Sequence, residues 1–249
     1  MRLCLIALGF FIKLYEIVGL AFFFFSKNKI KFSASFIFWC AVFFVLPMFF
    51  SSSEFIIQSY ADWYESLVHK NINNSDSLMQ NISAIGMIKK ILGMYDLSNF
   101  VFLVPALFLF GLQYIKINLY NDLRYQLGIL ASALIFIVLF SSGSESCIYI
   151  IAMSGFVIWF ILQEKPYNKY VITLLVLAIL LSVLGSSDLA PAYIKKEIVR
   201  PYALKALPFL ITWLTLVCQL LIMKKAPVTV LSNHYLEEEE MPSNLNKKD

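Results

Sequence analysis

Few residues in this sequence have side chains that could bind a charged ligand, and most lie within or at the ends of apolar segments. Lys13 and Glu16 interrupt a long apolar stretch, and a charge at the centre of a membrane helix costs about 2.5 to 3.5 kcal/mol. Glu145 is the one carboxylate in the run Ser-Ser-Gly-Ser-Glu-Ser at 141–146. Two interpretations are open: Lys13 pairs with Glu16 and the serine run is a polar turn, or Lys13 and Glu145 bind a ligand.

A second group of charges precedes the last apolar segment. Residues 186–202 hold Lys195, Lys196 and Arg200 next to aromatic side chains. Paired cations of this kind can bind a phosphate group, and Lys205, one helical turn further on, extends the cationic group. The same side chains could equally extend their charged ends to a membrane surface. The segment is therefore either a phosphate site or an interfacial stretch.

Motifs for other chemistries are missing from the sequence. His69 and His234 stand alone, the four cysteines show no CxxC spacing, and no P-loop, HExxH or GxSxG motif occurs. A net charge of +4, without a basic stripe, excludes a nucleic-acid-binding module. The sequence predicts neither a metal nor a cofactor, and no nucleic acid among its partners.

The segments that would position these residues are those of a membrane protein, because 60% of the residues are hydrophobic and the mean hydropathy is +0.76. Only 14% are charged, against about 25% in soluble domains. Crossing a bilayer takes about 20 apolar residues, and seven segments approach that length: 3–26, 33–50, 98–115, 126–141, 146–162, 171–185 and 203–223. We predict an all-α fold, a polytopic transmembrane helix bundle of about seven spans.

The distribution of lysine and arginine predicts the orientation of this bundle. One set of alternating loops holds nine of these residues and the other set six, and the more positive loops face the cytoplasm. We therefore predict a transmembrane domain over 1–223, in contact with membrane lipids, and a disordered cytoplasmic tail over 224–249. The first segment leaves an alternative open, in which its span begins only near Leu14.

The longest loop, 51–97, falls on the predicted outer face. Its apolar residues recur at spacings of three and four in two stretches, which predicts two amphipathic helices. The residues from Asn71 to Asp76 predict a turn between them. The helices either lie on the outer leaflet with aromatic anchors or form a lid over a site at the membrane surface. The lid interpretation rests on Tyr60, Trp63, Ser83, Gly86 and Lys89.

Several stretches of the sequence resemble a known family. They are Tyr60-x-x-Trp63-x-x-x-Leu67, Asn81-Ile82-Ser83-x-x-Gly86-Met87-Ile88-Lys89, and Phe140 to Ser146 running into Tyr149 and Trp159. They look like the C-terminal half of the polyprenol-phosphate-mannose-dependent alpha-1,2-mannosyltransferases, multi-pass glycosyltransferases of the GT-C type. The Ser-Glu-Ser turn is similar to that of members from the Bacteroidetes. Cys147-Ile148 departs from the Pro-Thr pair that the family would have after the turn.

The resemblance implies transfer of a hexose, mannose in this family, from a polyprenyl-phosphate-linked donor at the outer face of the bacterial inner membrane. The candidates for binding the donor phosphate are then Lys13, Glu145, Lys195, Lys196 and Arg200. The resemblance also implies an aspartate in the first outer loop as general base, and no acidic residue here follows a first span in that way. We expect this chain to be the C-terminal part of a longer enzyme, without the catalytic aspartate, and to work with an N-terminal-half polypeptide.

Two other functions are open at this point. An O-antigen ligase or polymerase-like membrane enzyme also has many spans and a large outer loop, but it favours arginines and a histidine there, where this chain has lysines and His69. A non-catalytic membrane subunit or a transporter is the third possibility. A transporter would show inverted halves with broken spans, and the sequence has no such repeat.

Overall fold

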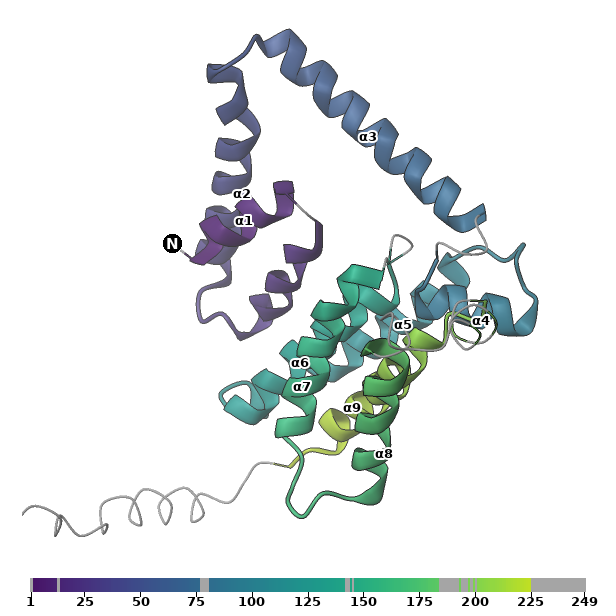
Figure 1. Ribbon diagram of the computed structural model, residues 1–249. Helices are drawn as coiled ribbons and strands as arrows, with labels where there is room; N and C mark the ends of the chain where they lie inside the picture. Colours follow the sequence, from purple (N-terminus) through teal and green to yellow (C-terminus); the bar gives the residue numbers. More distant parts are fainter. Residues whose placement is uncertain are drawn as a thin grey trace, which may run out of the picture.

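The protein is described by a computed structural model that covers residues 2–12, 14–76, 81–141, 144, 146–183, 193, 197, 199 and 201–224 of the 249-residue chain. Throughout these residues the regular structure is helical and no strand occurs. The predicted all-α fold is thereby confirmed. A compact group of helices lies at one side, and a long helical arm extends away from it (Figure 1).

The first apolar stretch forms two helices, so the single continuous span predicted over 3–26 is wrong. α1 (Arg2–Ile12) is followed by the 3-10 helix η1 (Leu14–Phe25), which folds back onto it. A Cβ atom on Gly19 would lie 2.6 Å from Cδ1 of Ile6, so the close approach of the two helices depends on a glycine.

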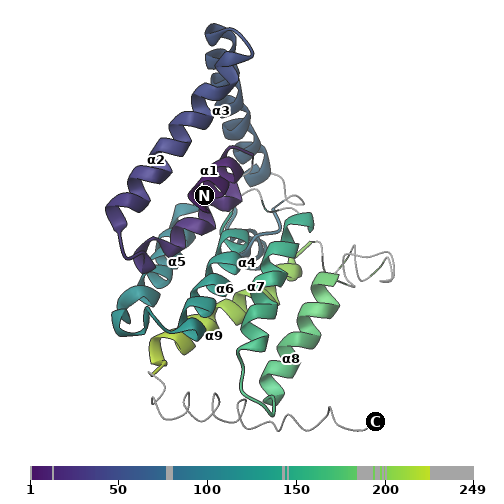
Figure 2. The same cartoon turned by 90° about the vertical axis from the view of Figure 1, so that its left-hand side faces the viewer.

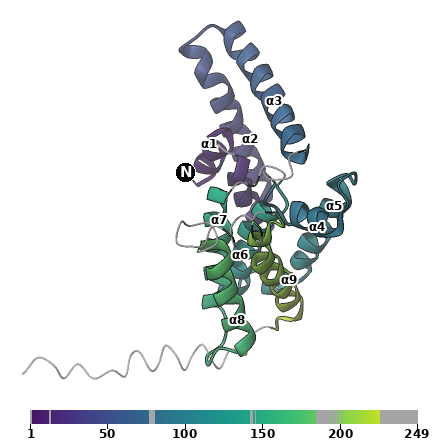
Figure 3. The same ribbon diagram turned by 45° about the vertical axis from the view of Figure 1, so that its right-hand side comes forward.

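The arm consists of two helices that meet at its far end (Figures 1 and 3). α2 (Lys29–Val45) begins at Asn28, whose Oδ1 accepts a hydrogen bond from the Lys31 backbone at 3.1 Å. It continues through η2 (Leu46–Phe49) to α3 (Ser53–Asp76). No residue of α2 or η2 is buried, although both are strongly apolar.

The loop 51–97 contains the two predicted helices, α3 and α4 (Ala84–Leu92). The turn predicted at Asn71 to Asp76 is wrong, because these residues are the last part of α3. The sequence from 53 to 76 contains neither glycine nor proline, so nothing in it interrupts the helical hydrogen bonds, and the weak helix preference of asparagine is not enough to end them.

The compact group is built from the remaining helices, with α6 and α7 side by side, α9 crossing them obliquely and α8 packed against α9 (Figure 2). Its core is aromatic, with Trp159, Trp213, Tyr125, Phe156 and Phe209 fully buried. The elements are α5 (Phe100–Leu112), η3 (Gln113–Ile115), η4 (Ile117–Leu119), α6 (Leu123–Leu139), η5 (Ser146–Ile148), α7 (Tyr149–Ile161), α8 (Lys169–Ala178), the π-helix η6 (Ile179–Val183), η9 (Leu204–Ala206) and α9 (Leu207–Ile222).

Glycine sets the distance between the two central helices of this group. A Cβ atom on Gly155 of α7 would lie 2.7 Å from the backbone oxygen of Ala131 in α6, and a backbone oxygen cannot turn away as a side chain can. Gly155 therefore lets α6 and α7 approach until their backbones nearly touch, as small residues do between membrane helices.

Two of the described helices are long and apolar enough to cross a membrane, Lys29–Phe49 with 21 residues and Leu204–Ile222 with 19. Five further apolar helices are shorter, with 10 to 17 residues: Leu3–Ile12, Phe100–Ile115, Leu123–Leu139, Ser146–Ile161 and Lys169–Ser182. The number of spans and the division at residue 223 stay predictions.

Candidate functional site

The residues predicted to bind a donor phosphate, Lys13, Glu145, Lys195, Lys196 and Arg200, lie outside the described part of the chain. Their immediate neighbours are described, however. The segment after the serine run forms η5 and α7, and Lys205 lies in η9 directly before α9. These neighbours show which elements meet at the end of the bundle where the predicted site would be.

The residues of the lid interpretation fall into two groups. Tyr60 and Trp63 are on α3, where the Tyr60 hydroxyl donates to the backbone oxygen of Phe44 at 3.0 Å and its ring stacks on that of Phe44 at 4.6 Å. Trp63 is 44% exposed. Tyr60 is therefore packed against α2. Ser83, Gly86 and Lys89 lie at α4 instead.

Ser83 caps α4. Its Oγ accepts a hydrogen bond from the Gly86 backbone at 3.0 Å, while its own backbone and hydroxyl donate to Oδ1 of Asn81 at 3.1 and 2.5 Å. Asn81 and Ser83 are both buried. A Cβ atom on Gly86 would lie 2.6 Å from the backbone oxygen of Asn81. The motif Asn-Ile-Ser-x-x-Gly is therefore a tightly closed helix start, for which serine is among the best residues.

Two lysines support this helix start. Lys90 Nζ donates to the backbone oxygen of Asn81 at 3.0 Å, and Lys89 Nζ donates to Oδ1 of Asn99 at 2.7 Å. Burial lowers the pKa of both ammonium groups. Both lysines thus have protein partners, Lys90 in the backbone before α4 and Lys89 in the loop after it.

The motif at 140–146 meets the motif at 81–89 at this point. The Ile82 backbone donates to the backbone oxygen of Ser144 at 3.4 Å, and the Tyr149 hydroxyl donates to the backbone oxygen of Ile82. Ser144 is anchored in turn, because its hydroxyl donates to the backbone oxygen of Val138 at the end of α6. Residues more than sixty positions apart in the sequence are thereby held together by backbone contacts.

Lys205 completes this junction. The side chain is only 5% exposed, and its Nζ donates to the backbone oxygen of Ser146 at 2.9 Å and to its Oγ at 2.8 Å. Nζ also lies 4.9 Å from the centre of the Tyr149 ring, a distance at which a cation is attracted to the ring face. Ser182 donates to the backbone oxygen of Lys205 at 3.4 Å.

The partners of the Lys205 ammonium described here are neutral. Within the described residues, no carboxylate lies within 4.0 Å of it. A buried ammonium is stabilised by an anion, so a negatively charged group would bind favourably at Lys205. Sequence reasoning placed Lys205 with the cations of 186–202 and did not connect it with the serine run. The one feature of the sequence that points to this contact is a single lysine at the start of the last apolar segment.

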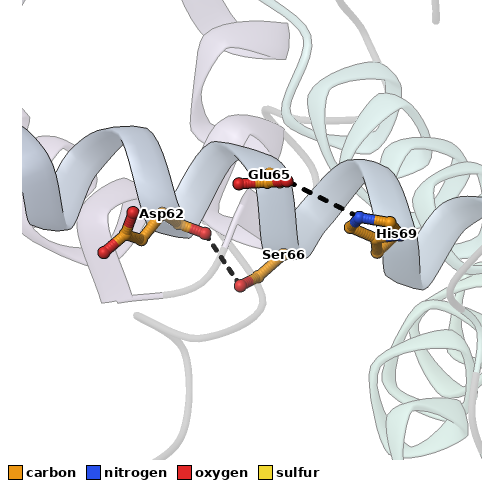
Figure 4. A network of polar contacts seen from close by, with 4 residues as sticks. All are labelled: Asp62, Glu65, Ser66 and His69. Atoms are coloured by element: carbon orange, nitrogen blue, oxygen red, sulfur yellow. Dashed lines mark hydrogen bonds and ion pairs between the residues drawn. The ribbon is translucent and has the colours of Figure 1, made fainter.

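The acidic residues on α3 have a different setting (Figure 4). Glu65 Oε1 and His69 Nε2 are 3.7 Å apart with side chains 70% and 69% exposed, and Ser66 Oγ donates to the Asp62 backbone oxygen at 2.8 Å. Gln58 donates to Oδ1 of Asp62 at 2.9 Å. These are contacts along the surface of one helix, and none of them joins α3 to another element.

Comparison with protein families gives a match to glycosyltransferase family 87 over residues 2–187. The chain belongs to this family. The matched region contains both motifs that meet at the junction, and Lys205 lies just beyond it. No curated protein and no solved structure matches the chain. Within this family 87 glycosyltransferase, the junction of Ser83, Ser144, Tyr149 and Lys205 is the candidate site, and a sugar donor is its expected ligand.

Proposed function

We propose that this chain is part of an integral membrane enzyme that transfers a hexose, mannose, from a polyprenyl-phosphate-linked donor to an acceptor at the outer face of the bacterial inner membrane. The observation that carries the proposal is the buried Lys205 ammonium, which lies among neutral partners at the junction of the two motifs. A phosphate group is the anion that such a donor would bring to it.

The exposed apolar surface supports a place in the membrane. α2 has no buried residue, and Ile30, Phe49 and Phe50 are 80% exposed or more. Helices that are apolar on all sides are found in a protein core or in lipid. α2 packs against α1 and η1 on one side, while other apolar side chains, such as Ile37 and Phe38, stay exposed. We therefore propose that the apolar helices form a transmembrane domain over 1–223, with a cytoplasmic tail over 224–249.

A test of this arrangement uses reporters fused to the chain. Fusions after residue 75 and after residue 190 are expected to report the outer side, and a fusion after residue 225 the cytoplasm. A fusion after residue 75 and one after residue 225 that report the same side would contradict the arrangement.

In the proposed reaction an acceptor hydroxyl attacks the anomeric carbon of the hexose, the bond from that carbon to the phosphate oxygen breaks, and polyprenyl phosphate leaves. Lys205 binds the phosphate and stabilises the charge it gains, as cations do in such transfers. Lys13, Glu145, Lys195, Lys196 and Arg200 are the further donor-binding candidates, and the α3 and α4 residues cover the site. The base that takes the hydroxyl proton comes from an N-terminal-half polypeptide.

The experiment that tests this function reconstitutes the chain in liposomes with radiolabelled polyprenyl-phosphate mannose and a membrane acceptor. One arm contains the chain alone and a second adds a polypeptide with the outer-loop aspartate. We expect transfer in the second arm and a loss of about tenfold or more with Lys205→Met, since a factor of ten is about 1.4 kcal/mol of lost transition-state stabilisation.

Lys205→Arg keeps the charge and is expected to retain more activity than Lys205→Met. Lys31→Met, an exposed lysine of α2, is the matched control and should leave transfer unchanged. Donor binding and transfer that are the same in the parent and in folded Lys205→Met would contradict the role of the ammonium. Transfer by the chain alone would show that a carboxylate of this chain is the base.

A further inference from the structure

The opposite end of the helix bundle contains a cavity that the proposed transfer reaction does not use. Its volume is about 490 Å³, within the range of about 300 to 1,000 Å³ of small-molecule sites. It lies between the start of α6, the end of α7, the start of α8 and the end of α9. The polar residues that line it are Arg124, Gln163, Glu164, Asn168, Tyr170 and Gln219.

Amide groups arranged in a chain form one wall of this cavity. Trp159 Nε1 donates to Oε1 of Gln219 at 2.9 Å, Gln219 Nε2 donates to Oε1 of Gln163 at 2.9 Å, and Gln163 Nε2 donates to the Trp159 backbone oxygen at 2.8 Å. An amide nitrogen has two hydrogens, and each of these two contacts uses one. These hydrogen bonds therefore fix the side chains of Gln163 and Gln219 in place. One hydrogen on each amide nitrogen stays available for a ligand with oxygen atoms.

Two opposite charges line the same cavity without pairing. Arg124 is held by the backbone oxygen of Leu162 at 3.2 Å, and within the described residues no carboxylate, including that of Glu164, lies within 4.0 Å of it. Arg124 and Glu164 would gain little by pairing with each other, because an ion pair at the surface is worth little. A ligand that carries both charges could bind between them and satisfy each at once.

The surroundings of the cavity favour a lipid over a small soluble ligand. Gly128, Leu216 and Leu220 give it an apolar wall on the side of the bundle. Tyr170 is 45% exposed, and its hydroxyl lies 2.7 Å from Oγ1 of Thr215. A tyrosine with a solvent-accessible hydroxyl and a ring against apolar groups is typical of the membrane surface. This end of the bundle is also the one that the lysine and arginine bias predicts to face the cytoplasm.

We propose that this cavity binds the headgroup of a phospholipid with a phosphodiester and a primary ammonium group. The phosphate lies at Arg124, whose planar guanidinium suits phosphate oxygens, and the ammonium lies at Glu164. The amides of Gln163 and Gln219 donate to ester or phosphate oxygens, and the acyl chains leave along the apolar wall.

The test measures lipid binding to the full chain purified in maltoside detergent, by calorimetric titration with short-chain lipids. The probes are dihexanoyl phosphatidylethanolamine, the choline analogue and the glycerol analogue. We expect the ethanolamine lipid to bind about tenfold more tightly than the choline lipid, because a trimethylammonium group cannot donate a hydrogen bond to a carboxylate. Equal affinity for these two lipids, tighter binding of the glycerol lipid, or no binding of any probe would overturn the proposal.

Two exposed residues provide the variants, so that loss of folding is not expected. Glu164→Gln should lower the affinity for the ethanolamine lipid to that for the choline lipid, and Arg124→Gln should weaken both by about tenfold. Lys169→Gln removes a neighbouring cation that does not line the cavity and should change neither. If Arg124→Gln and Lys169→Gln weaken binding equally, the attraction is a general one to positive charge and the assigned contacts are wrong. A circular dichroism melt of each variant confirms that it is folded.

Discussion

α3 and α4 show the same apolar spacing in the sequence, yet α3 leaves most of its side chains exposed whereas α4 buries its first four residues, Ala84 to Met87. The polar contacts of Asp62, Glu65 and Ser66 run along the surface of α3 itself, and the Tyr60 hydroxyl reaches only the adjoining arm helix α2. Those of α4 reach the serine turn through Ile82 and the loop after it through Lys89. Amphipathic spacing thus gives a helix, and the residues that precede the helix determine whether it docks against a neighbour.

The largest expected difference between the helices concerns their apolar faces. Ile85→Ala removes a side chain that is only 2% exposed, and such a truncation costs about 2 to 5 kcal/mol. Trp63→Ala on α3, where the ring is 44% exposed, should change stability by less than about 0.5 kcal/mol in micelles.

Hydrogen exchange of the α4 amides measures the effect of Ile85→Ala, and hydrogen exchange of the α3 amides measures the effect of Trp63→Ala. Faster exchange in α4 after Ile85→Ala, with unchanged α3, is the expected pattern. Equal effects of the two substitutions on their own helices would show that α3 is packed as firmly as α4, and the comparison would fail.

The sequence could predict the helices themselves, but not the contacts between them. The spacing in 51–97 located α3 and α4, and the apolar runs located the helices of the bundle. The hydrogen bond from Ile82 to Ser144 and the contact of Lys205 with Ser146 join residues about sixty positions apart, and local patterns contain no information about such pairs. The turn at Asn71 to Asp76 was wrong because turn propensity is weak where no glycine or proline enforces it.

The next effect concerns the glycine of the helix start. Gly86→Ala would place a methyl group 2.6 Å from the backbone oxygen of Asn81, which has to move. Such overpacking costs about 1 to 3 kcal/mol, so the thermal unfolding temperature should fall. Gly111→Ala in α5, where a Cβ atom would meet nothing within 4 Å, is the control and should not lower it. A Gly86→Ala variant as stable as the parent would show that the loop around Asn81 adapts freely.

A smaller effect is expected for two serines that are both in contact with backbone atoms. Ser83→Ala removes the cap of α4, at a cost of about 1 kcal/mol, and takes the hydroxyl donor from Oδ1 of Asn81, which keeps the backbone donor of residue 83. Ser66→Ala on α3 removes a bond from Oγ to the Asp62 backbone within the same exposed helix, where water replaces it. Exchange rates of the α4 amides should rise about fivefold or more with Ser83→Ala. The α3 rates should stay within about twofold for Ser66→Ala, and the opposite order would contradict the capping role.

The smallest effect belongs to the pair of Glu65 and His69. Both side chains are about 70% exposed and their nearest charged atoms are 3.7 Å apart, so the pair is worth at most about 0.5 kcal/mol even when the histidine is protonated. Glu65→Gln should therefore leave α3 exchange unchanged within about twofold at pH 5 and at pH 8. A tenfold rise that occurs only at pH 5 would correspond to about 1.4 kcal/mol. Water around an exposed pair cannot account for so large a value, so another element would then have to cover this face of α3, which would make α3 a docked helix like α4.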